Sequence, residues 1–237
     1  MRFAILQCDD VLEELQPRFG NYPEMIGGMF DDCGEIVTTD NFDCRRGIYP
    51  EDLNAYDCYI TTGSRASVYD PEPWIQDLVE FVRLLDRQRK KLIGICFGHQ
   101  IIAVAKGCSV GKSDKGWGIG VSVNRVVARP SWMSDPRDTL QIIVSHQDQV
   151  MTLSQNAQVI AGSDFCPFFI VQWNSHFLSI QGHPEWERDY SRALIDARRR
   201  IIPTERAAEG LDSLSRTPDN RIFTRWILDF INSSESE

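Results

Sequence analysis

The segment from Lys91 to Gln100, with sequence KLIGICFGHQ, constrains the fold more than any other part of this chain. Its apolar start predicts a buried strand that ends at Cys96, and the apolar run after Gly98 predicts a helix. Gly94 and Gly98 allow the backbone to turn sharply and to approach its neighbours closely. A strand that leads through a tight turn directly into a helix is the arrangement of a nucleophile elbow, here with a cysteine at its tip.

The residues before and after this segment predict an α/β fold. Short apolar runs that predict strands occur at residues 2–7, 35–39, 58–62 and 92–96. Amphipathic stretches that predict helices occur at residues 72–88 and 98–106. Because strands that alternate with helices form parallel sheets with helices on both faces, we expect a doubly wound, mostly parallel sheet flanked by helices.

The pattern changes after Gly107, where strand-like runs follow one another with few helix signals between them. We expect strands at residues 118–127, 139–145, 158–161, 168–173 and 176–181. The last two predict a hairpin with Asn174 and Ser175 at its turn. Such strands favour a small antiparallel sheet packed alongside the main one. From about residue 190 the sequence predicts a helical C-terminal extension, which ends in a polar Ser/Glu stretch.

Length and charge limit the number of domains and the kinds of partner. With 237 residues, of which 42% are hydrophobic, the chain can bury one substantial core, so residues 1–237 are expected to form a single domain. The net charge of −9 disfavours nucleic acid as a partner, because an acidic surface repels phosphates. The basic run from Arg198 to Arg200 is interpreted as a solvated helix face. No apolar segment is long enough for a membrane span, so no membrane partner is expected.

The seven cysteines indicate reduced thiols rather than disulfides or a metal site. Their number is odd, they form no CxxC pair, and none shows the Cys/His spacing of a zinc site. The N-terminus has no signal-peptide layout. We therefore expect a cytoplasmic protein with no metal and no cofactor. Only Cys96 has a chemical context, which favours a nucleophile over a buried structural cysteine.

A thiol nucleophile needs a base, and the chain offers His99, His146, His176 and His183. His99 follows Cys96 on the same predicted helix, so its ring would point along the helix. His146 follows a strand, and His176 lies at a hairpin turn where solvation is expected. His183 ends an apolar strand, and Glu185 follows it after Pro184. A carboxylate that holds one ring nitrogen leaves the other to face the thiol, which favours Cys96, His183 and Glu185 as a catalytic set over a capped turn into the final helices.

Acyl transfer also requires hydrogen-bond donors for the oxygen that becomes negatively charged. The segment from Thr61 to Arg65 follows the third predicted strand and should lie at the same sheet edge as Cys96. The backbone N–H at Gly63 could pair with that of Phe97 to form such an oxyanion hole. The alternative is a simple strand-to-loop turn, and the spacing alone leaves both interpretations open.

Together these motifs resemble those of the class I glutamine amidotransferases, and the order and spacing agree from residue 1 to about 190. The cysteine motif Gly-x-Cys-x-Gly-x-Gln is matched by Gly94, Cys96, Gly98 and Gln100. The His-Pro-Glu motif is matched at 183–185, and the oxyanion segment at 62–64. The Ser-His-x-Asp segment of the GMP-synthetase-like branch is matched by Ser145, His146 and Asp148. The resemblance implies a flavodoxin-like fold and a free-standing member of the family.

The resemblance also implies a mechanism. Cys96 would attack the side-chain amide carbon of glutamine or of another γ-glutamyl amide, while His183 transfers the proton and Glu185 orients His183. Gly63 and Phe97 would form the oxyanion hole. Four residues would bind the substrate: Ser64, Gln100, Ser145 and His146. Water would then release glutamate from a γ-glutamyl thioester.

The leading functional hypothesis is a stand-alone hydrolase of a γ-glutamyl amide, with glutamine or a γ-glutamyl metabolite as its small-molecule substrate. The alternative is an ammonia-donating glutaminase subunit whose partner is a separate synthetase. A cysteine-bearing stress or redox protein of related fold is less favoured. No Gly-rich phosphate loop for ATP is found in the sequence. Trp117 and Trp186 could contact a leaving group larger than ammonia or pack in the core. The physiological substrate, the pathway and the oligomeric state are left open.

Overall fold

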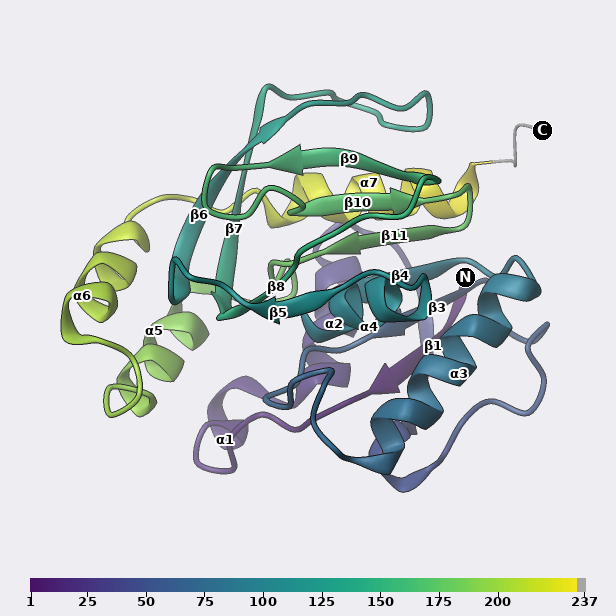
Figure 1. The fold of residues 1–237 in the computed structure, drawn as a ribbon, viewed down its shortest axis with the longest axis horizontal. Coiled ribbons are helices and arrows are strands. Elements are labelled where there is room, and N and C mark those ends of the chain that lie inside the picture. Colours follow the sequence, from purple (N-terminus) through teal and green to yellow (C-terminus); the bar gives the residue numbers. More distant parts are fainter. Residues whose placement is uncertain (234–237) are drawn as a thin grey trace.

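A nine-stranded sheet runs through the computed structural model of the protein, which describes residues 1–233 (Figure 1). The strands lie in the order β2-β1-β3-β4-β11-β10-β9-β6-β7. Along the chain they are β1 (Arg2–Gln7), β2 (Thr38–Asp43), β3 (Cys58–Thr61), β4 (Leu92–Ile95), β6 (Gly118–Val126), β7 (Thr139–His146), β9 (Ala157–Gly162), β10 (Ile170–Trp173) and β11 (Phe177–Ile180). The polar Ser/Glu stretch expected at the chain end falls largely on residues 234–237, outside the described part.

The sheet is mixed in its strand directions. From β2 to β11 neighbouring strands pair in parallel, and from β11 to β7 they pair antiparallel. The strands predicted after Gly107 therefore extend the main sheet. A separate antiparallel sheet consists of β5 (Val110–Lys112) and β8 (Asp148–Val150). The predicted α/β class with a small additional antiparallel sheet is confirmed. The strands that form the small sheet, however, are not the ones that the sequence suggested.

Helices cover both faces because side chains alternate along the central strands. On β1, Phe3 and Ile5 belong to one apolar core and Ala4 and Leu6 to the other, as expected for the two-residue period of a strand. Four helices supply the covering side chains: α2 (Tyr22–Asp31) and α7 (Asn220–Asn232) on the first face, and α3 (Pro73–Arg87) and α4 (Phe97–Ala105) on the second.

A third apolar cluster lies where the chain's later helices meet β6 and β7. Figure 1 shows α5 (Arg188–Ala197) and α6 (Thr204–Ser213) together at this end of the sheet. Ile119 and Ile143 from the strands pack there with Leu194 and Ile195 from α5. Two short elements complete the description, namely α1 (Gln16–Phe19) and a 3-10 helix at Cys44–Arg46.

Several elements differ from the sequence-based expectation. The second strand lies at Thr38–Asp43 instead of 35–39, and it is a polar strand at the edge of the sheet. Helix α2 and the two short strands of the small sheet were not predicted. The hairpin turn at Asn174 is confirmed: β10 and β11 pair antiparallel, and Asn174 has a φ of +55°.

The strand order places three chain segments side by side at one edge of the sheet. Strands β3, β4 and β11 are parallel neighbours, with Thr61 beside Gly94 and Ile180 beside Ile95. Since parallel strands end at the same edge, the segments after these three strands meet there. They carry the residues from Thr62 onwards, from Cys96 onwards and from Gln181 onwards.

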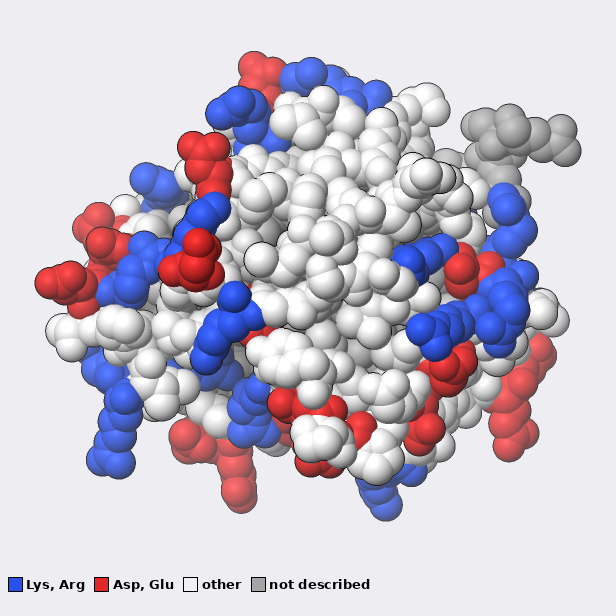
Figure 2. Space-filling model, viewed as in Figure 1, with Lys and Arg blue, Asp and Glu red and all other residues white. Residues whose placement is uncertain are grey.

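The charged side chains are mixed in sign on the face seen in Figure 2, where they lie mainly around the rim of a largely uncharged centre. The net charge of −9 is thus not gathered into one acidic field on this face. Within residues 1–233, no helix combines the length and the apolar character that a membrane span would need.

Candidate active site

Cys96 and His183 come together at this edge of the sheet. Cys96 directly follows β4, and its backbone N–H donates to the carbonyl oxygen of Ile180 at the end of β11 (2.8 Å). Gln181 donates from Nε2 to the Cys96 Sγ atom (3.6 Å). Gly63 arrives from the end of β3: a Cβ atom at this position would lie 2.8 Å from His183 Cε1 and 3.7 Å from Cys96 Cβ. The three segments therefore converge on the thiol.

The turn at Cys96 is sharp, and two glycines make it sterically possible. Cys96 caps helix α4 with φ +51° and ψ −97°, a conformation that non-glycine residues rarely adopt. A Cβ atom on Gly94 would lie 2.6 Å from Ile102 Cδ1, and one on Gly98 would collide with Thr61 Oγ1. The glycine spacing of the motif thus follows from the close packing of β4, α4 and β3.

Cys96, His183 and Glu185 form a continuous buried contact. The His183 Nδ1 atom lies 2.8 Å from Glu185 Oε1, and the ring and the Cys96 side chain both lie against Gly63. His183 is 2% exposed and Cys96 is 5% exposed. Burial opposes a charge on the ring, but the charge of Glu185 and the contact with Cys96 raise the pKa of His183 to about 9. The ring is therefore favoured in its protonated form beside the sulfur.

His99 and His146 occupy sites that favour the neutral ring. His99 is fully buried on α4 with Nδ1 2.8 Å from Ser179 Oγ, and burial lowers its pKa to about 3. The His146 Nδ1 atom lies 3.1 Å from the carbonyl oxygen of Asp148, and burial lowers the pKa of His146 to about 4. Neither ring is stabilised as a cation.

The expectation that His176 is solvated is wrong. The ring is buried beneath the hairpin turn, with Nε2 2.7 Å from Asp86 Oδ1. Burial lowers the pKa of His176, and Asp86 opposes that shift. The sequence position at a turn suggested exposure, but α3 supplies a carboxylate that covers the ring.

The backbone N–H groups of Gly63 and Phe97 were predicted to form the oxyanion hole, and both residues lie beside Cys96. Phe97 is the first residue of α4, and the first N–H groups of a helix have no partner within the helix. Gly63 lies against both Cys96 and His183, because a Cβ atom added to Gly63 would be 3.7 Å from Cys96 Cβ and 2.8 Å from His183 Cε1. Two backbone donors near one sulfur are an arrangement that could stabilise a developing negative charge.

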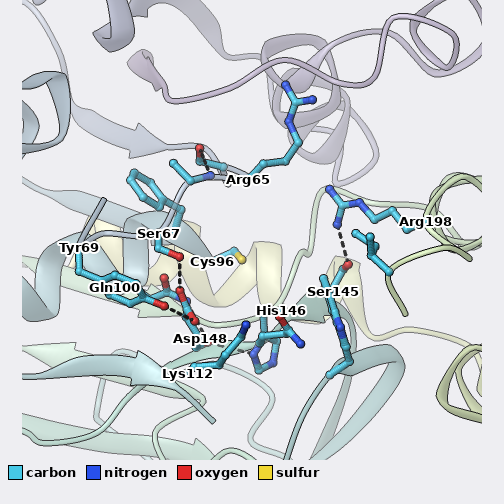
Figure 3. A pocket seen from close by; sticks show the side chains of 16 residues that line it. Arg65, Ser67, Tyr69, Cys96, Gln100, Lys112, Ser145, His146, Asp148 and Arg198 are labelled. Atoms are coloured by element: carbon cyan, nitrogen blue, oxygen red, sulfur yellow. Dashed lines mark hydrogen bonds between the residues drawn. The ribbon is translucent and has the colours of Figure 1, made fainter. Parts of the chain in front are cut away.

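A pocket of about 290 Å³ opens in front of Cys96 (Figure 3). The four predicted substrate-binding residues all line it: Ser64, Gln100, Ser145 and His146. Gln100 donates from Nε2 to the carbonyl oxygen of Asp148 (3.0 Å) and to Gln181 Oε1 (3.1 Å). The Oγ atom of Ser64 accepts a bond from the N–H of Ala66 (3.1 Å).

Charged side chains of both signs line this pocket: Asp148 with its cross-strand neighbour Lys112 on one side, Arg198 on the other, and Arg65. On one side the Asp148 carboxylate accepts bonds from Ser67 Oγ (2.6 Å) and Tyr69 Oη (3.0 Å). On the other side, Arg198 donates from Nη1 to Ser145 Oγ (3.1 Å). For a ligand that carries both an ammonium and a carboxylate group, Asp148 offers a partner to the first and Arg198 to the second.

Sequence reasoning missed Arg198 as a pocket residue. The basic run was assigned to a solvated helix face, but Arg198 at the end of α5 lines the pocket beside Trp117 and Ile201. Nothing in the local sequence distinguishes it from the exposed Arg199. Only the packing of α5 against the end of the sheet brings its guanidinium to Ser145.

The two tryptophans that the sequence placed near the motifs have different positions. Trp117 lines the pocket, where a leaving group could contact it. Trp186 is 2% exposed and stacks on the His183 ring, so it does not face the pocket. Among residues 1–233 no three His, Cys, Asp or Glu side chains are grouped so that they could hold a metal ion.

The sequence was compared with protein-family models and with the sequences of known proteins. Residues 48–193 match the family model for class I glutamine amidotransferases. Gamma-glutamyl peptidase 2 of Arabidopsis thaliana is 33% identical over 228 residues, covering 93% of this chain and 91% of the plant protein. One subunit of a glutamine-hydrolysing GMP synthase from Ignicoccus hospitalis is 27% identical over 62% of this chain and 76% of its own.

A solved structure agrees at the level of the fold. A glutamine amidotransferase from Thermotoga maritima is similar with a TM-score of 0.78, covering 98% of this chain and 99% of its own. The sequences are 19% identical, so this similarity concerns the architecture alone.

Proposed function

Because this chain belongs to the class I glutamine amidotransferase family, we propose that it is a free-standing hydrolase that cleaves a γ-glutamyl amide bond through a thioester on Cys96. The observation that carries the proposal is the buried contact between Cys96 and a His183 ring whose Nδ1 is held by Glu185 at 2.8 Å. A thiol, an imidazole and an orienting carboxylate in this order are the parts of a cysteine acyl-transfer site.

In the first half of the reaction, the Cys96 thiolate attacks the γ-carbonyl carbon, and a carbon–sulfur bond forms. The carbonyl electron pair moves onto oxygen, which becomes negatively charged. When this intermediate collapses, the carbon–nitrogen bond breaks and His183 gives its proton to the leaving amine. Glu185 keeps Nδ1 of His183 occupied, so that Nε2 is the nitrogen that faces the sulfur.

In the second half, water attacks the γ-glutamyl thioester. His183, now neutral, accepts a proton from this water, and the carbon–sulfur bond breaks to regenerate the thiolate. Glutamate leaves, and the protonated ring is restored. The backbone N–H groups of Gly63 and Phe97 stabilise the oxyanion in both halves, because they are already oriented before charge develops.

The pocket supports recognition of a glutamyl group by its charges. We assign the α-ammonium group of the substrate to the side of Asp148 and Gln100, and the α-carboxylate to the side of Ser145 and Arg198. Ser64 and His146 complete the lining near the thiol. The leaving amine would then extend towards the open part of the pocket near Trp117.

The peptidase alternative within this family is favoured over the ammonia-donating subunit. The relative named gamma-glutamyl peptidase covers nine-tenths of both chains, whereas the GMP synthase subunit matches a smaller share at lower identity. We therefore propose a γ-glutamyl peptide as the substrate class. A stress or redox protein of related fold would not require a histidine at the thiol, and His183 lies there. The seven cysteines are unpaired, which supports a reducing, cytoplasmic location.

The experiment is a turnover panel with glutamine, γ-glutamyl amines and γ-glutamyl dipeptides, with Cys96→Ala as the inactive control. We expect the dipeptides to be hydrolysed faster than glutamine by the wild-type protein. Slow glutamine turnover that rises only when a synthetase is added would support the ammonia-donating alternative instead. If no compound in the panel is hydrolysed above the Cys96→Ala background, the proposal is wrong.

A further inference from the structure

Trp186 lies flat against the ring of His183. The two ring centroids are 3.5 Å apart and the planes differ by 7°, which is a parallel stack. Both residues are 2% exposed, so the pair is shielded from bulk water. A stack this close places the π-face of the indole directly on the imidazole.

Trp186 is held in this position from several sides. Its backbone N–H donates to the His183 carbonyl oxygen (3.3 Å), and its own carbonyl oxygen accepts a bond from Asn220 Nδ2 (2.7 Å). The Tyr190 ring and the indole meet in an edge-to-face contact, with centroids 4.9 Å apart and planes at 76°. His183 and Tyr190 therefore both pack against the indole, which cannot rotate freely.

Packing alone does not explain why this residue is a tryptophan. The indole Nε1 atom is buried and has no hydrogen-bond partner in the described part of the chain. A buried N–H without a partner is unfavourable, and a phenylalanine would fill much of the same space without it. Tryptophan, however, has the aromatic face that binds a cation most strongly.

The ring beneath this indole is the one that carries a positive charge during the proposed reaction. Three titratable side chains act on it from different elements: Cys96 after β4, Glu185 on the same segment and His146 at the end of β7. Glu185 and Cys96 favour the charged ring, and a charge on His146 would disfavour it. Trp186 is a neutral partner, and an aromatic face of this kind attracts a cation.

We propose that Trp186 is a positioning residue that stabilises the protonated His183 ring through a cation–π contact and fixes the plane of that ring beside Cys96. The inference rests on the proposed function for its catalytic meaning, but the contact itself is a property of the folded protein. It concerns a residue outside the set of Cys96, His183 and Glu185.

The test compares Trp186→Leu with Trp186→Phe. Loss of the aromatic face should lower the pKa of His183, which is about 9 in the intact site. We expect the alkaline limb of the kcat/KM profile of Trp186→Leu to move down by about half to one and a half pH units. Trp186→Phe should shift it in the same direction by a smaller amount. Because the ring is also less firmly oriented, kcat of Trp186→Leu should fall on the order of tenfold.

A matched control variant distinguishes the loss of the Trp186–His183 stack from a general loss of core packing. Leu194→Ala removes a buried side chain from the same apolar cluster but on helix α5, so it should lower thermal stability without moving the alkaline limb. An equal shift in Leu194→Ala and Trp186→Leu would overturn the proposal. So would an unshifted limb in Trp186→Leu.

Two further measurements keep the inference testable if Trp186→Leu does not fold or if no substrate is found. Titration of the His183 ring by NMR reports its pKa without any turnover. Replacing all six tryptophans with increasingly fluorinated analogues weakens the π-face with little change in shape. The pKa of His183 should then fall step by step with fluorination, and a constant pKa would contradict the cation–π contact. Failure of the wild-type protein to hydrolyse γ-glutamyl amides would contradict the proposed function and leave this titration readable.

Discussion

Among single residues, the four histidines show how local surroundings select one base. Burial lowers the pKa of His99, His146 and His176, whereas Glu185 and Cys96 reverse that effect at His183. All four rings are buried, so exposure does not distinguish them. The selection depends on whether a carboxylate and a thiol both reach the ring.

Gly63→Ala should reduce kcat strongly. The added methyl group would lie 2.8 Å from His183 Cε1, so either the ring or the strand end must shift, and a shift of the ring moves its proton away from Cys96. We expect a loss of about 10-fold to 100-fold in kcat, measured by steady-state kinetics. Gly111→Ala is the control, because its methyl group would find only Met151 Cγ, at 3.9 Å. Wild-type kcat in Gly63→Ala would contradict the close approach.

Arg198→Met should mainly raise KM. If Arg198 binds the substrate carboxylate, its loss removes a charge-assisted hydrogen bond, which amounts to about 1.5–3 kcal/mol, or roughly 10-fold to 100-fold in KM. Arg199→Met is the matched control, because Arg199 lies next in the chain but is exposed and pairs with Asp196. Equal kinetic effects of the two substitutions would exclude the assigned role.

The residues of the site differ in how far the sequence could reveal them. Cys96, His183 and Glu185 were predicted because their residue types and neighbours are chemically unusual together, and the structure brings them into contact. Arg198 could not be predicted, because an arginine in a basic run has the same local pattern whether it faces water or a pocket. Its position depends on the packing of a distant helix.

Among helices and strands, the sequence predicted those whose pattern is strong. Strands β1, β3 and β4 and helices α3 and α4 lie within a residue or two of the expected ranges, since buried apolar runs and a clear amphipathic period define them. Strand β2 was placed too early because it is polar and lies at the sheet edge. Helix α2 has a signal that could have been used, the capping box formed by Asn21 and Glu24.

Two helical glycines should respond in opposite ways to substitution by alanine. On α4, a methyl group at Gly98 would collide with Thr61 Oγ1, so Gly98→Ala should separate α4 from β3 and destabilise the protein by several kcal/mol. On α2, a methyl group at Gly27 would meet nothing within 4 Å, so Gly27→Ala should stabilise by about 0.5–1 kcal/mol. Urea unfolding of both variants checks the pair. A stable, active Gly98→Ala protein would show that α4 does not need this contact.

For the molecule as a whole, the site depends on the order of the strands. Cys96 and His183 are far apart in the chain and meet because β4 and β11 are parallel neighbours. The sequence indicates which segments are strands, but it does not state which strand pairs with which, because pairing is decided by the packing of the entire sheet. For the same reason the later strands were expected in a separate layer, whereas they extend the main sheet.

The free energy of unfolding should depend on pH in a way that follows from the buried histidines. His99 and His146 have pKa values lowered from 6.5 to about 3 and about 4, so the unfolded chain binds protons first and stability falls as the pH drops below 6.5. Each contributes a loss approaching about 1.4 kcal/mol per pH unit in this range. His183 has a raised pKa of about 9, so its contribution is complete below pH 6.5 and is lost as the pH rises towards 9.

Urea titrations between pH 7 and pH 5 check this acid limb. Asp9 and Asp10 have pKa values lowered from 3.8, so their contributions are lost only at still lower pH and do not obscure the histidines. The His99→Gln variant should show a shallower decrease than the wild-type protein over the same range. An unfolding free energy that stays constant from pH 7 to pH 5 would contradict the assignment of neutral buried rings.

Acylation of Cys96 by a γ-glutamyl group, with the help of His183, is the step on which the proposed function depends. It can be observed by mass spectrometry of the intact protein, quenched in acid during incubation with a γ-glutamyl dipeptide. We expect a mass increase of one glutamyl group that maps to the peptide containing Cys96, and its absence in both Cys96→Ala and His183→Ala. An adduct on another residue, or an equally strong adduct in the His183→Ala protein, would show that this step does not occur as proposed.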